Sequence, residues 1–178
     1  MIIALMIGRA GSRMPGKNVR KILGRPLCAY PLIACQNSKI VDEIFVSTDC
    51  DKIKKISKKY NAKIIVRPKK LATKKALSED AFVHGYNYIK KQLGKKKSRI
   101  KYIVLLYANS PTVNKELILK GVKILNKNKL YDSAVSTSVY NMWSPLRARK
   151  LRKDGTLKPF VPFEVFGNPK TLNCDRDS

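Results

Sequence analysis

Residues 2–18, IIALMIGRAGSRMPGKN, change abruptly from apolar to basic character. The first part, Ile2–Ile7, is entirely apolar, which is typical of a strand that is covered on both faces of a parallel sheet. Gly8 ends this run, and a loop with glycine and basic residues follows directly. In open α/β sheets, ligands bind beyond the carboxyl ends of the strands. The stretch therefore predicts an α/β fold with a ligand site directly after its first strand.

The loop after this strand has the composition of a polyphosphate site. Gly11 and Gly16 allow backbone conformations that other residues resist, so backbone amides can approach a ligand closely. Arg9, Arg13 and Lys17 supply hydrogen-bond donors and positive charge. The loop is neither GxGxxG nor GxxxxGK[ST], so the dinucleotide and P-loop fingerprints do not apply.

The whole chain is strongly basic. It has 178 residues, enough for one domain with a sizeable core, and its 38 Lys and Arg against 12 Asp and Glu give a formal net charge of +26. Such a charge is typical of a nucleic-acid-binding protein, or of a surface whose lysines only keep it in solution. We favour the second interpretation and expect no nucleic-acid partner, because most lysines are scattered or lie in short runs without interleaved aromatic residues.

The cysteines and the apolar runs bear on the cellular compartment. Cys28, Cys35, Cys50 and Cys174 form no CxxC pair, so a zinc site is not expected. We interpret Cys28 and Cys35 as buried free thiols. The apolar start is short and lacks a basic leader, so it does not predict a signal peptide, and no apolar run approaches the length of a membrane span. We expect a cytoplasmic protein with no membrane contact.

Strand-like and helix-like patterns alternate along the chain, which predicts an α/β fold with a largely parallel sheet. We expect a nucleotide-binding core at residues 1–138 and an arm at residues 139–178. The expected strands are Ile2–Ile7, Glu43–Ser47, Lys63–Val66, Ile100–Tyr107 and Ser133–Ser138, and the expected helices are Leu27–Gln36, Asp51–Tyr60, Ser78–Leu93 and Asn114–Lys127.

Local signals add detail to two of these helices. Pro26 is expected in the first turn of its helix, where a missing amide costs little. Ser78 is expected as the N-cap of helix Ser78–Leu93. The buried stripe of that helix is expected to consist of Ala81, Val83, Tyr86 and Ile89.

Polar clusters follow the carboxyl ends of the expected strands, at residues 9–18, 48–49, 67–68 and 109–112. We expect them to meet at one edge of the sheet. Asp49 suits capping of the next helix and contact with a ligand equally well. Arg67 suits a ligand contact better than a surface ion pair, which would contribute little.

The loop at residues 9–18, RAGSRMPGKN, resembles the signature loop of the sugar-acid cytidylyltransferases, roughly RGGSKGLPGKN. Three later segments resemble motifs of the same family: VSTD at 46–49, RPKKLAT at 67–73 (RPxELAxDTA) and LLYANSPT at 105–112 (LLQPTSPLRT). The chain departs from the family in a loop that is one residue shorter, at Lys74, where Asp is frequent, and at Tyr107, where glutamine is usual. Lys17-Asn18 is similar to the acylneuraminate branch, and TLNCDRDS at 171–178 to the legionaminate-type branch.

The resemblance implies a three-layer, Rossmann-like nucleotidyltransferase fold that transfers CMP from CTP to a nonulosonic, acylneuraminate-like sugar acid in surface-glycan synthesis. Two alternatives remain: another nucleotidyltransferase of this fold, acting on KDO or another sugar, and a non-catalytic, basic nucleic-acid-binding α/β protein. The resemblance suggests Arg9 and Lys17 as catalytic residues, Arg9, Gly11, Ser12, Lys17, Asn18, Arg67 and Ser78 as nucleotide-binding residues, and Tyr107, Asn109 and Ser110 as substrate-binding residues.

The resemblance also implies Mg²⁺, which bridges phosphate oxygens and takes carboxylate ligands. The family supplies these largely from a DxD-like motif near its C-terminus. Asp175 and Asp177 have this spacing, but they occur too early to be that motif. They are our metal candidates, and we expect the chain to be incomplete at its C-terminus.

The arm is rich in aromatic residues and contains the sole tryptophan, Trp143. The Asp154-Gly155 turn predicts a hairpin across residues 148–160. Exposed apolar area of this kind needs a partner surface. Together with the resemblance, it predicts a homodimer that is built on the arm.

Overall fold

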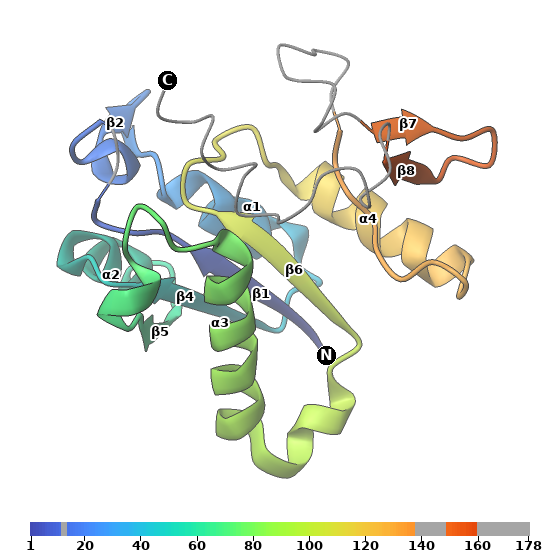
Figure 1. Ribbon diagram of the computed structural model, residues 1–178, viewed down its shortest axis with the longest axis horizontal. Coiled ribbons are helices and arrows are strands. Elements are labelled where there is room, and N and C mark those ends of the chain that lie inside the picture. The colour runs from blue at the N-terminus through green and yellow to red at the C-terminus, as the bar shows by residue number, and fades with distance from the viewer. Residues whose placement is uncertain (12–13, 138–148, 160–178) are drawn as a thin grey trace. The chain divides into compact units, whose positions relative to one another are not determined.

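The computed structural model describes residues 1–11, 14–137 and 149–159. The chain divides into two compact units, Met1–Val135 and Ser136–Ser178. The first unit is built on a four-stranded sheet with the order β5-β4-β1-β6, in which all neighbouring strands are parallel (Figure 1). Its strands are β1 (Ile2–Ile7), β4 (Glu43–Thr48), β5 (Lys63–Val66) and β6 (Tyr102–Tyr107). The predicted α/β class with a largely parallel sheet is confirmed.

Helices cover both faces of this sheet and give three layers (Figure 1). Successive strand residues point to opposite faces, and both sets in β1 are buried. Ile3 and Leu5 pack in the core beneath α3, whereas Ala4 and Met6 belong to the core on the opposite face. The helices are α1 (Ala29–Ser38), α2 (Asp51–Lys58) and α4 (Lys115–Lys127), which contribute to the second core, and α3 (Ser78–Leu93), which contributes to the first.

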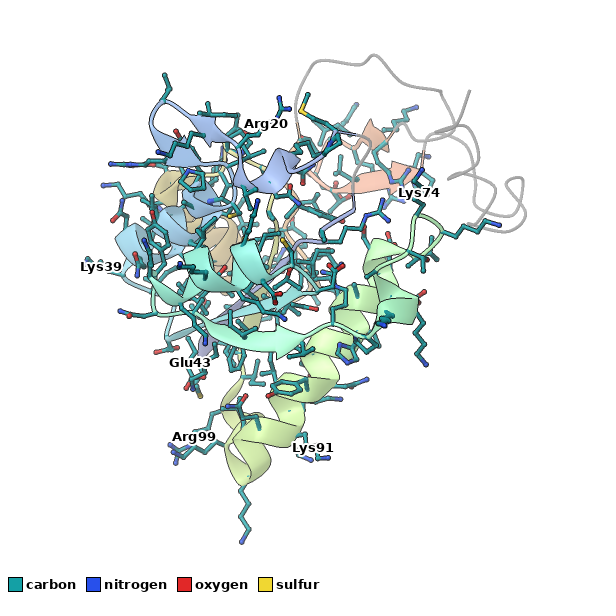
Figure 2. The ribbon with its side chains drawn as sticks, turned by 90° about the vertical axis from the view of Figure 1, so that its left-hand side faces the viewer. Arg20, Lys39, Glu43, Lys74, Lys91 and Arg99 are labelled. Atoms are coloured by element: carbon teal, nitrogen blue, oxygen red, sulfur yellow. The ribbon has the colours of Figure 1, made fainter. Side chains whose placement is uncertain are left out.

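Charged side chains lie on the outside of these layers. Lys39, Glu43, Lys91 and Arg99 project away from the ribbon in Figure 2. Among the described residues, no helix is long and apolar enough to cross a membrane. Short 3-10 helices complete the connections: η1 (Lys17–Val19), η2 (Lys69–Leu71) and η3 (Gly94–Arg99).

The prediction for Pro26 was wrong. Pro26 belongs to a small antiparallel hairpin of β2 (Lys21–Ile22) and β3 (Arg25–Pro26), and helix α1 begins three residues later, at Ala29. The hairpin turns at Leu23 and Gly24, which both have positive φ angles of 48° and 80°. Two successive positive φ angles are typical of the tight turn that joins two antiparallel strands.

Helix α3 has the predicted bounds but not the predicted stripe. Its N-cap is Leu77 rather than Ser78, and no side chain caps it. The buried residues are Ala81, Gly85 and Ile89, whereas Val83 and Tyr86 are exposed. The reason is the small residue Gly85: a β-carbon there would lie 2.9 Å from both methyl carbons of Leu5. The helix backbone approaches β1 closely at Gly85, and this turns Val83 and Tyr86 outward.

The strand predicted at Ser133–Ser138 is also wrong for the part that the structure describes. Residues 133–137 form no strand and are exposed, including Val135, so this segment has no buried face to hold it in a sheet. Ser138 lies outside the described residues.

In the second unit, β7 (Arg149–Leu151) and β8 (Leu157–Pro159) form the predicted antiparallel hairpin around Gly155. Trp143 and the phenylalanines of the arm are outside the described residues, so the dimer stays a prediction. Cys28 and Cys35 are buried free thiols, as predicted.

Candidate active site

The carboxyl ends of all four parallel strands meet at one edge of the sheet. Ile7 of β1 lies opposite Ser47 of β4 and Tyr107 of β6, and Thr48 lies opposite Val66 of β5. The segments that leave these ends begin with Gly8, Asp49, Arg67 and Ala108. The structure therefore brings together the polar clusters that the sequence places after each strand.

Arg67 is the most buried charged residue at this edge, with 6% of its surface exposed. Its Nη2 donates a hydrogen bond of 2.7 Å to the carbonyl oxygen of Ser47, and its Nε donates one of 3.3 Å to the hydroxyl of the same residue. Its backbone amide also donates to the carbonyl oxygen of Thr48. These contacts exclude the surface ion pair that was the alternative for Arg67.

The charges around Arg67 oppose one another. Burial, which removes the guanidinium from water, lowers the pKa of Arg67 from its ordinary value. The carboxylate of Asp49 raises that pKa, whereas the positive charge of Arg9 lowers it. Arg9 and Arg67 are therefore close enough to repel each other, with Asp49 as the anion that partly compensates them.

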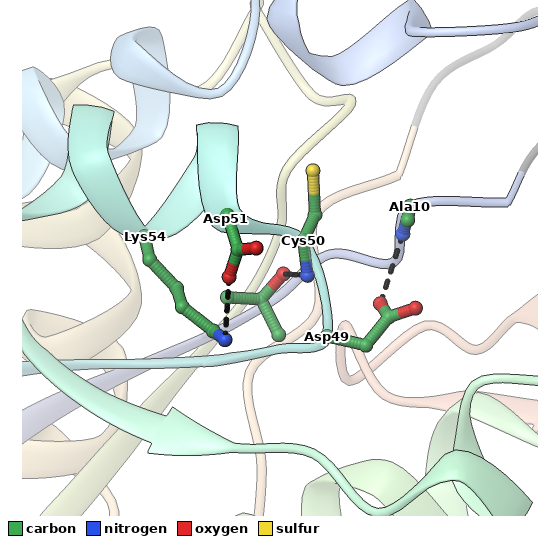
Figure 3. Close-up of polar contacts among 6 residues, drawn as sticks. Ala10, Asp49, Cys50, Asp51 and Lys54 are labelled. Carbon is green, nitrogen blue, oxygen red and sulfur yellow. Dashed lines mark hydrogen bonds and ion pairs between the residues drawn. The ribbon is translucent and has the colours of Figure 1, made fainter.

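Asp49 holds the loop that follows β1. Its Oδ1 accepts a hydrogen bond of 2.9 Å from the backbone amide of Ala10 (Figure 3). Helix α2 does not use Asp49 as its cap, because its N-cap residue is Cys50, whose amide donates to Thr48 Oγ1 at 3.1 Å. Of the two interpretations of Asp49, capping is thus excluded.

Arg9 connects this loop to the segment after β5. Its guanidinium Nη1 donates to the carbonyl oxygen of Thr73. Its own carbonyl oxygen accepts a hydrogen bond of 3.2 Å from Asn18 Nδ2. Arg9 is half-buried, and its two hydrogen bonds, to Thr73 and from Asn18, hold its side chain and its backbone.

The end of the loop turns at Gly16, which has a left-handed backbone with φ 66° and ψ 14°. Its carbonyl oxygen accepts from the amides of Val19 and Arg20, and half-buried Lys17 follows as the first residue of η1. The prediction for Gly16 is confirmed. Gly11 has no positive φ angle and lies in open space, so it does not use the backbone freedom of a glycine, and its contact with the nucleotide stays a prediction. Ser12 lies outside the described residues, as does Arg13.

Asn18 braces the loop against helix α1. Its carbonyl oxygen accepts a hydrogen bond of 2.9 Å from the amide of Cys28, directly before that helix. Its Oδ1 is buried and has no hydrogen-bond partner among the described residues. A buried acceptor without a partner is costly, and a donor from a ligand or a water molecule would relieve that cost.

The predicted substrate-binding residues lie at the end of β6. Tyr107 is partly exposed, and its ring meets that of Phe82 edge-on, with centroids 5.4 Å apart. Asn109 is exposed, and the amide of Ser110 donates to the carbonyl oxygen of Tyr107 at 3.2 Å. Ser78 is half-buried at the start of α3, a short distance along the chain from Thr73, whose carbonyl oxygen accepts from Arg9. Their contacts with ligands stay predictions.

The described residues do not form a metal site by themselves. Within residues 1–11, 14–137 and 149–159, no group of three or more His, Cys, Asp or Glu side chains is arranged to hold a metal ion. Asp49 is a carboxylate at the correct edge of the sheet, but one of its oxygens accepts from Ala10. Asp175 and Asp177 are outside the described residues.

Sequence reasoning missed two residues that shape the site. Ser47 holds Arg67 through its carbonyl and its hydroxyl, and it is completely buried. Its signal is visible in the sequence as a polar residue at the end of an otherwise apolar strand. Thr73 accepts from Arg9 through its backbone carbonyl, a contact that leaves no signal in the side-chain pattern.

The chain matches the family described as cytidylyltransferase over residues 3–153, most of its length. The chain belongs to the cytidylyltransferase family. Its sequence is 32% identical, over 136 residues, to a pseudaminic acid cytidylyltransferase of Campylobacter jejuni. The matched region covers 74% of this chain and 57% of that protein. It is 31% identical, over 176 residues, to a CMP-N,N'-diacetyllegionaminic acid synthase of Legionella pneumophila. This matched region covers 96% of this chain and 73% of that protein.

The chain spans only 32% and 57% of the length of the first two curated relatives that it matches. A solved structure of a CMP-2-keto-3-deoxy-manno-octonic acid synthetase complexed with CTP is similar to this structure, with a TM-score of 0.56 and 16% sequence identity. That similarity covers 72% of this chain and 48% of the solved chain. It supports the nucleotidyltransferase fold that the sequence resemblance implied.

Proposed function

We propose that this protein transfers CMP from CTP to a nonulosonic sugar acid and releases pyrophosphate. The observation that carries the proposal is the pair of guanidinium groups, Arg9 and Arg67, that repel each other beside a glycine-containing loop at the ligand-binding edge of a parallel sheet. Family membership supplies the class of reaction, and the names of the Campylobacter and Legionella relatives point to nonulosonic acids as the acceptors.

The electrostatics of the free site favour a polyanion. Arg9, Arg67 and Lys17 bring three positive charges to this edge, and Asp49 is the carboxylate whose charge acts on Arg67. A triphosphate would offset the remaining positive charge and relieve the repulsion between Arg9 and Arg67. Because Arg67 is buried, its attraction to a phosphate is screened less by water than that of a surface residue.

In the proposed reaction, a hydroxyl oxygen of the sugar acid attacks the α-phosphorus of CTP. A new oxygen–phosphorus bond forms, and the bond between the α-phosphorus and the oxygen that joins it to the β-phosphorus breaks. Pyrophosphate leaves with the electron pair, and the proton of the hydroxyl is released to water. Arg9 and Lys17 are the groups proposed to stabilise the charge that develops on the phosphate oxygens, because fixed cations are the main protein contribution to such transfers. Arg67 and Asn18 are proposed to bind the nucleotide, together with the loop backbone and Ser78.

We assign the acceptor to the end of β6, where Tyr107, Asn109 and Ser110 lie beside the end of β1. A partly exposed tyrosine ring, an amide and a hydroxyl are suited to a sugar acid, which presents both apolar ring faces and polar groups. The product would be an activated sugar for surface-glycan synthesis. Free Cys28, Cys35 and Cys50 fit a reducing cytoplasm, where we place the reaction.

Mg²⁺ is part of the proposal, with Asp175 and Asp177 as the candidate ligands. These two carboxylates would hold the ion, which would offset the negative charge of the triphosphate. The described residues do not supply a complete set of ligands for the metal ion. The roles proposed for Arg9, Lys17 and Arg67 therefore do not depend on the ion. A homodimer built on the arm at residues 139–166 is proposed on the aromatic content of that segment.

Binding and turnover are tested separately. Calorimetry with CTP, UTP, ATP and GTP, each with and without Mg²⁺, is expected to show preferential binding of CTP. A pyrophosphate-release assay with CTP and pseudaminic, legionaminic, acylneuraminic and KDO acceptors then identifies the sugar, and EDTA tests the metal. Binding of all four nucleotides with equal affinity, or tighter binding of an oligonucleotide than of CTP, would refute the proposal.

A further inference from the structure

We propose that Asp49 is a positioning residue, which holds the phosphate-binding loop through its hydrogen bond to the amide of Ala10. This inference rests on the proposed function, because it assigns the loop after β1 to the phosphates of CTP. Asp49 is not proposed to touch the nucleotide. It acts through the backbone that carries Arg9.

The first argument is the way in which β1 and β4 separate. The amide of Gly8 donates to the carbonyl oxygen of Ser47 at 3.1 Å, as the parallel ladder of the two strands requires. The next bond of such a ladder, two residues further on, would join the amide of Ala10 to the backbone carbonyl of Asp49. The side-chain Oδ1 of Asp49 accepts this bond instead, at 2.9 Å (Figure 3). The loop can therefore leave the sheet while its backbone stays attached to β4.

The second argument is the position of Arg9 within the attached segment. Arg9 lies between Gly8 and Ala10, whose amides are both bonded to the end of β4. Its carbonyl oxygen accepts from Asn18, and its guanidinium donates to Thr73. Loss of the Ala10 bond would leave the peptide unit after Arg9 held at its carbonyl oxygen alone, by Asn18. A small displacement of a group at a reacting centre is costly.

The third argument is that the charge and the hydrogen bond of Asp49 act in opposite directions on an incoming phosphate. The carboxylate repels a polyanion, whereas the hydrogen bond holds the loop that binds it. Asp49→Asn keeps an oxygen acceptor for Ala10 but removes the charge, and Asp49→Ala removes both. A residue that acted only through its charge would respond in the same way to both substitutions.

The chain offers a matched control two residues away. Asp51 lies at the start of α2, its side chain is 94% exposed, and it pairs with Lys54 at 2.8 Å (Figure 3). Asp51→Asn removes the same charge from the same region, and among the described residues the polar partner of Asp51 is Lys54 rather than a residue of the loop.

The experiment measures CTP affinity by calorimetry and hydrogen exchange of the Ala10 amide in the free 178-residue protein. We expect Asp49→Ala to weaken CTP binding roughly tenfold, the loss of one hydrogen bond to a charged group, while Asp49→Asn stays within about threefold of the unmodified protein or binds more tightly. Asp51→Asn is expected to change nothing. Ala10 is expected to exchange faster in Asp49→Ala but to stay protected in Asp49→Asn, with the amide of Leu5 in β1 as an internal reference.

The outcomes separate this inference from the proposed function. If the unmodified protein does not bind CTP, the proposed function fails, and exchange at Ala10 still decides whether Asp49 anchors the loop. If CTP binds but Asp49→Ala behaves like Asp51→Asn, the inference is wrong. Equal weakening by Asp49→Ala and Asp49→Asn would also overturn it, because the charge rather than the hydrogen bond would then be required.

Discussion

Gly8 and Ala108 face each other at the ends of β1 and β6, so closely that a β-carbon on Gly8 would lie 2.7 Å from the β-carbon of Ala108. The same atom would lie 3.3 Å from Cδ1 of Ile53 in α2. Gly8 thus allows three elements to meet directly beneath the candidate site. A single methyl group would force at least one of them to move.

We expect Gly8→Ala to lower the free energy of unfolding by about 1–3 kcal/mol, the usual cost of an overpacked core. The melting temperature should fall by roughly 2–4 °C for each kcal/mol, and CTP binding should weaken because the loop begins at this residue. Gly11→Ala is the control for stability, since Gly11 lies in open space without a positive φ angle. Equal stability of the two variants by thermal and chemical unfolding would contradict the close approach.

Lys17→Ala is expected to weaken CTP binding without unfolding the protein. Lys17 is half-buried and directly follows the left-handed Gly16, which directs the chain into η1. Loss of a charge-assisted contact with phosphate should cost about 1.5–3 kcal/mol, or roughly ten- to a hundredfold in affinity. Lys21→Ala, at an exposed residue of β2, removes the same charge nearby and serves as the control. Calorimetry that gives equal affinities for both variants would refute the role of Lys17.

Arg67→Lys is expected to reduce both stability and CTP affinity although it preserves the positive charge. A lysine cannot reproduce the two hydrogen bonds that the guanidinium donates to Ser47, and an ammonium is harder to bury. We expect a loss of about 1–3 kcal/mol in the free energy of unfolding. Arg20→Lys, at an exposed position, should leave both quantities unchanged. Stability of Arg67→Lys within error of the unmodified protein would show that these hydrogen bonds do not support the site.

The sequence predicts the two central strands, β1 and β4, well because both of their faces are buried. The continuous apolar run of Ile2–Ile7 has no alternative that buries all its side chains, and its bounds are confirmed. Helix α3 shows the limit of periodicity. Its stripe depends on how closely its backbone approaches Leu5, and only a glycine at position 85 permits that approach. An apolar pattern weights Val83 and Tyr86 by hydrophobicity and gives Gly85 no weight.

The candidate site is also predicted only in part. Side-chain type and position after a strand indicate Arg9, Lys17 and Arg67, and parallel pairing brings the strand ends together. The contacts of Arg9 with the carbonyl of Thr73 and of Asp49 with the amide of Ala10 involve backbone groups, which every residue carries. The residue type does not indicate which backbone group will accept or donate, so these two contacts are visible only in the folded structure.

The buried thiols predict a loss of stability at alkaline pH. Burial raises the pKa of Cys28 to about 11 and that of Cys35 to about 12. In the unfolded chain, both thiols ionise near pH 8.5. Above that pH, the folded protein therefore keeps protons that the unfolded chain has lost, and the free energy of unfolding falls as pH rises toward 11. The stabilising contribution is fully present below about pH 8.5.

Each such thiol should contribute a slope of about 1.4 kcal/mol per pH unit. Lysines and tyrosines also titrate in this range, so the measurement compares the unmodified protein with Cys35→Ala by chemical unfolding under reducing conditions between pH 9 and 11. The substitution lowers stability at every pH through the cavity that it leaves, but the difference between the two proteins should shrink as pH rises, because the variant no longer has this thiol to ionise on unfolding. Parallel stability curves would show that Cys35 ionises as easily in the folded protein as in the unfolded chain, in conflict with its burial on the inner face of α1.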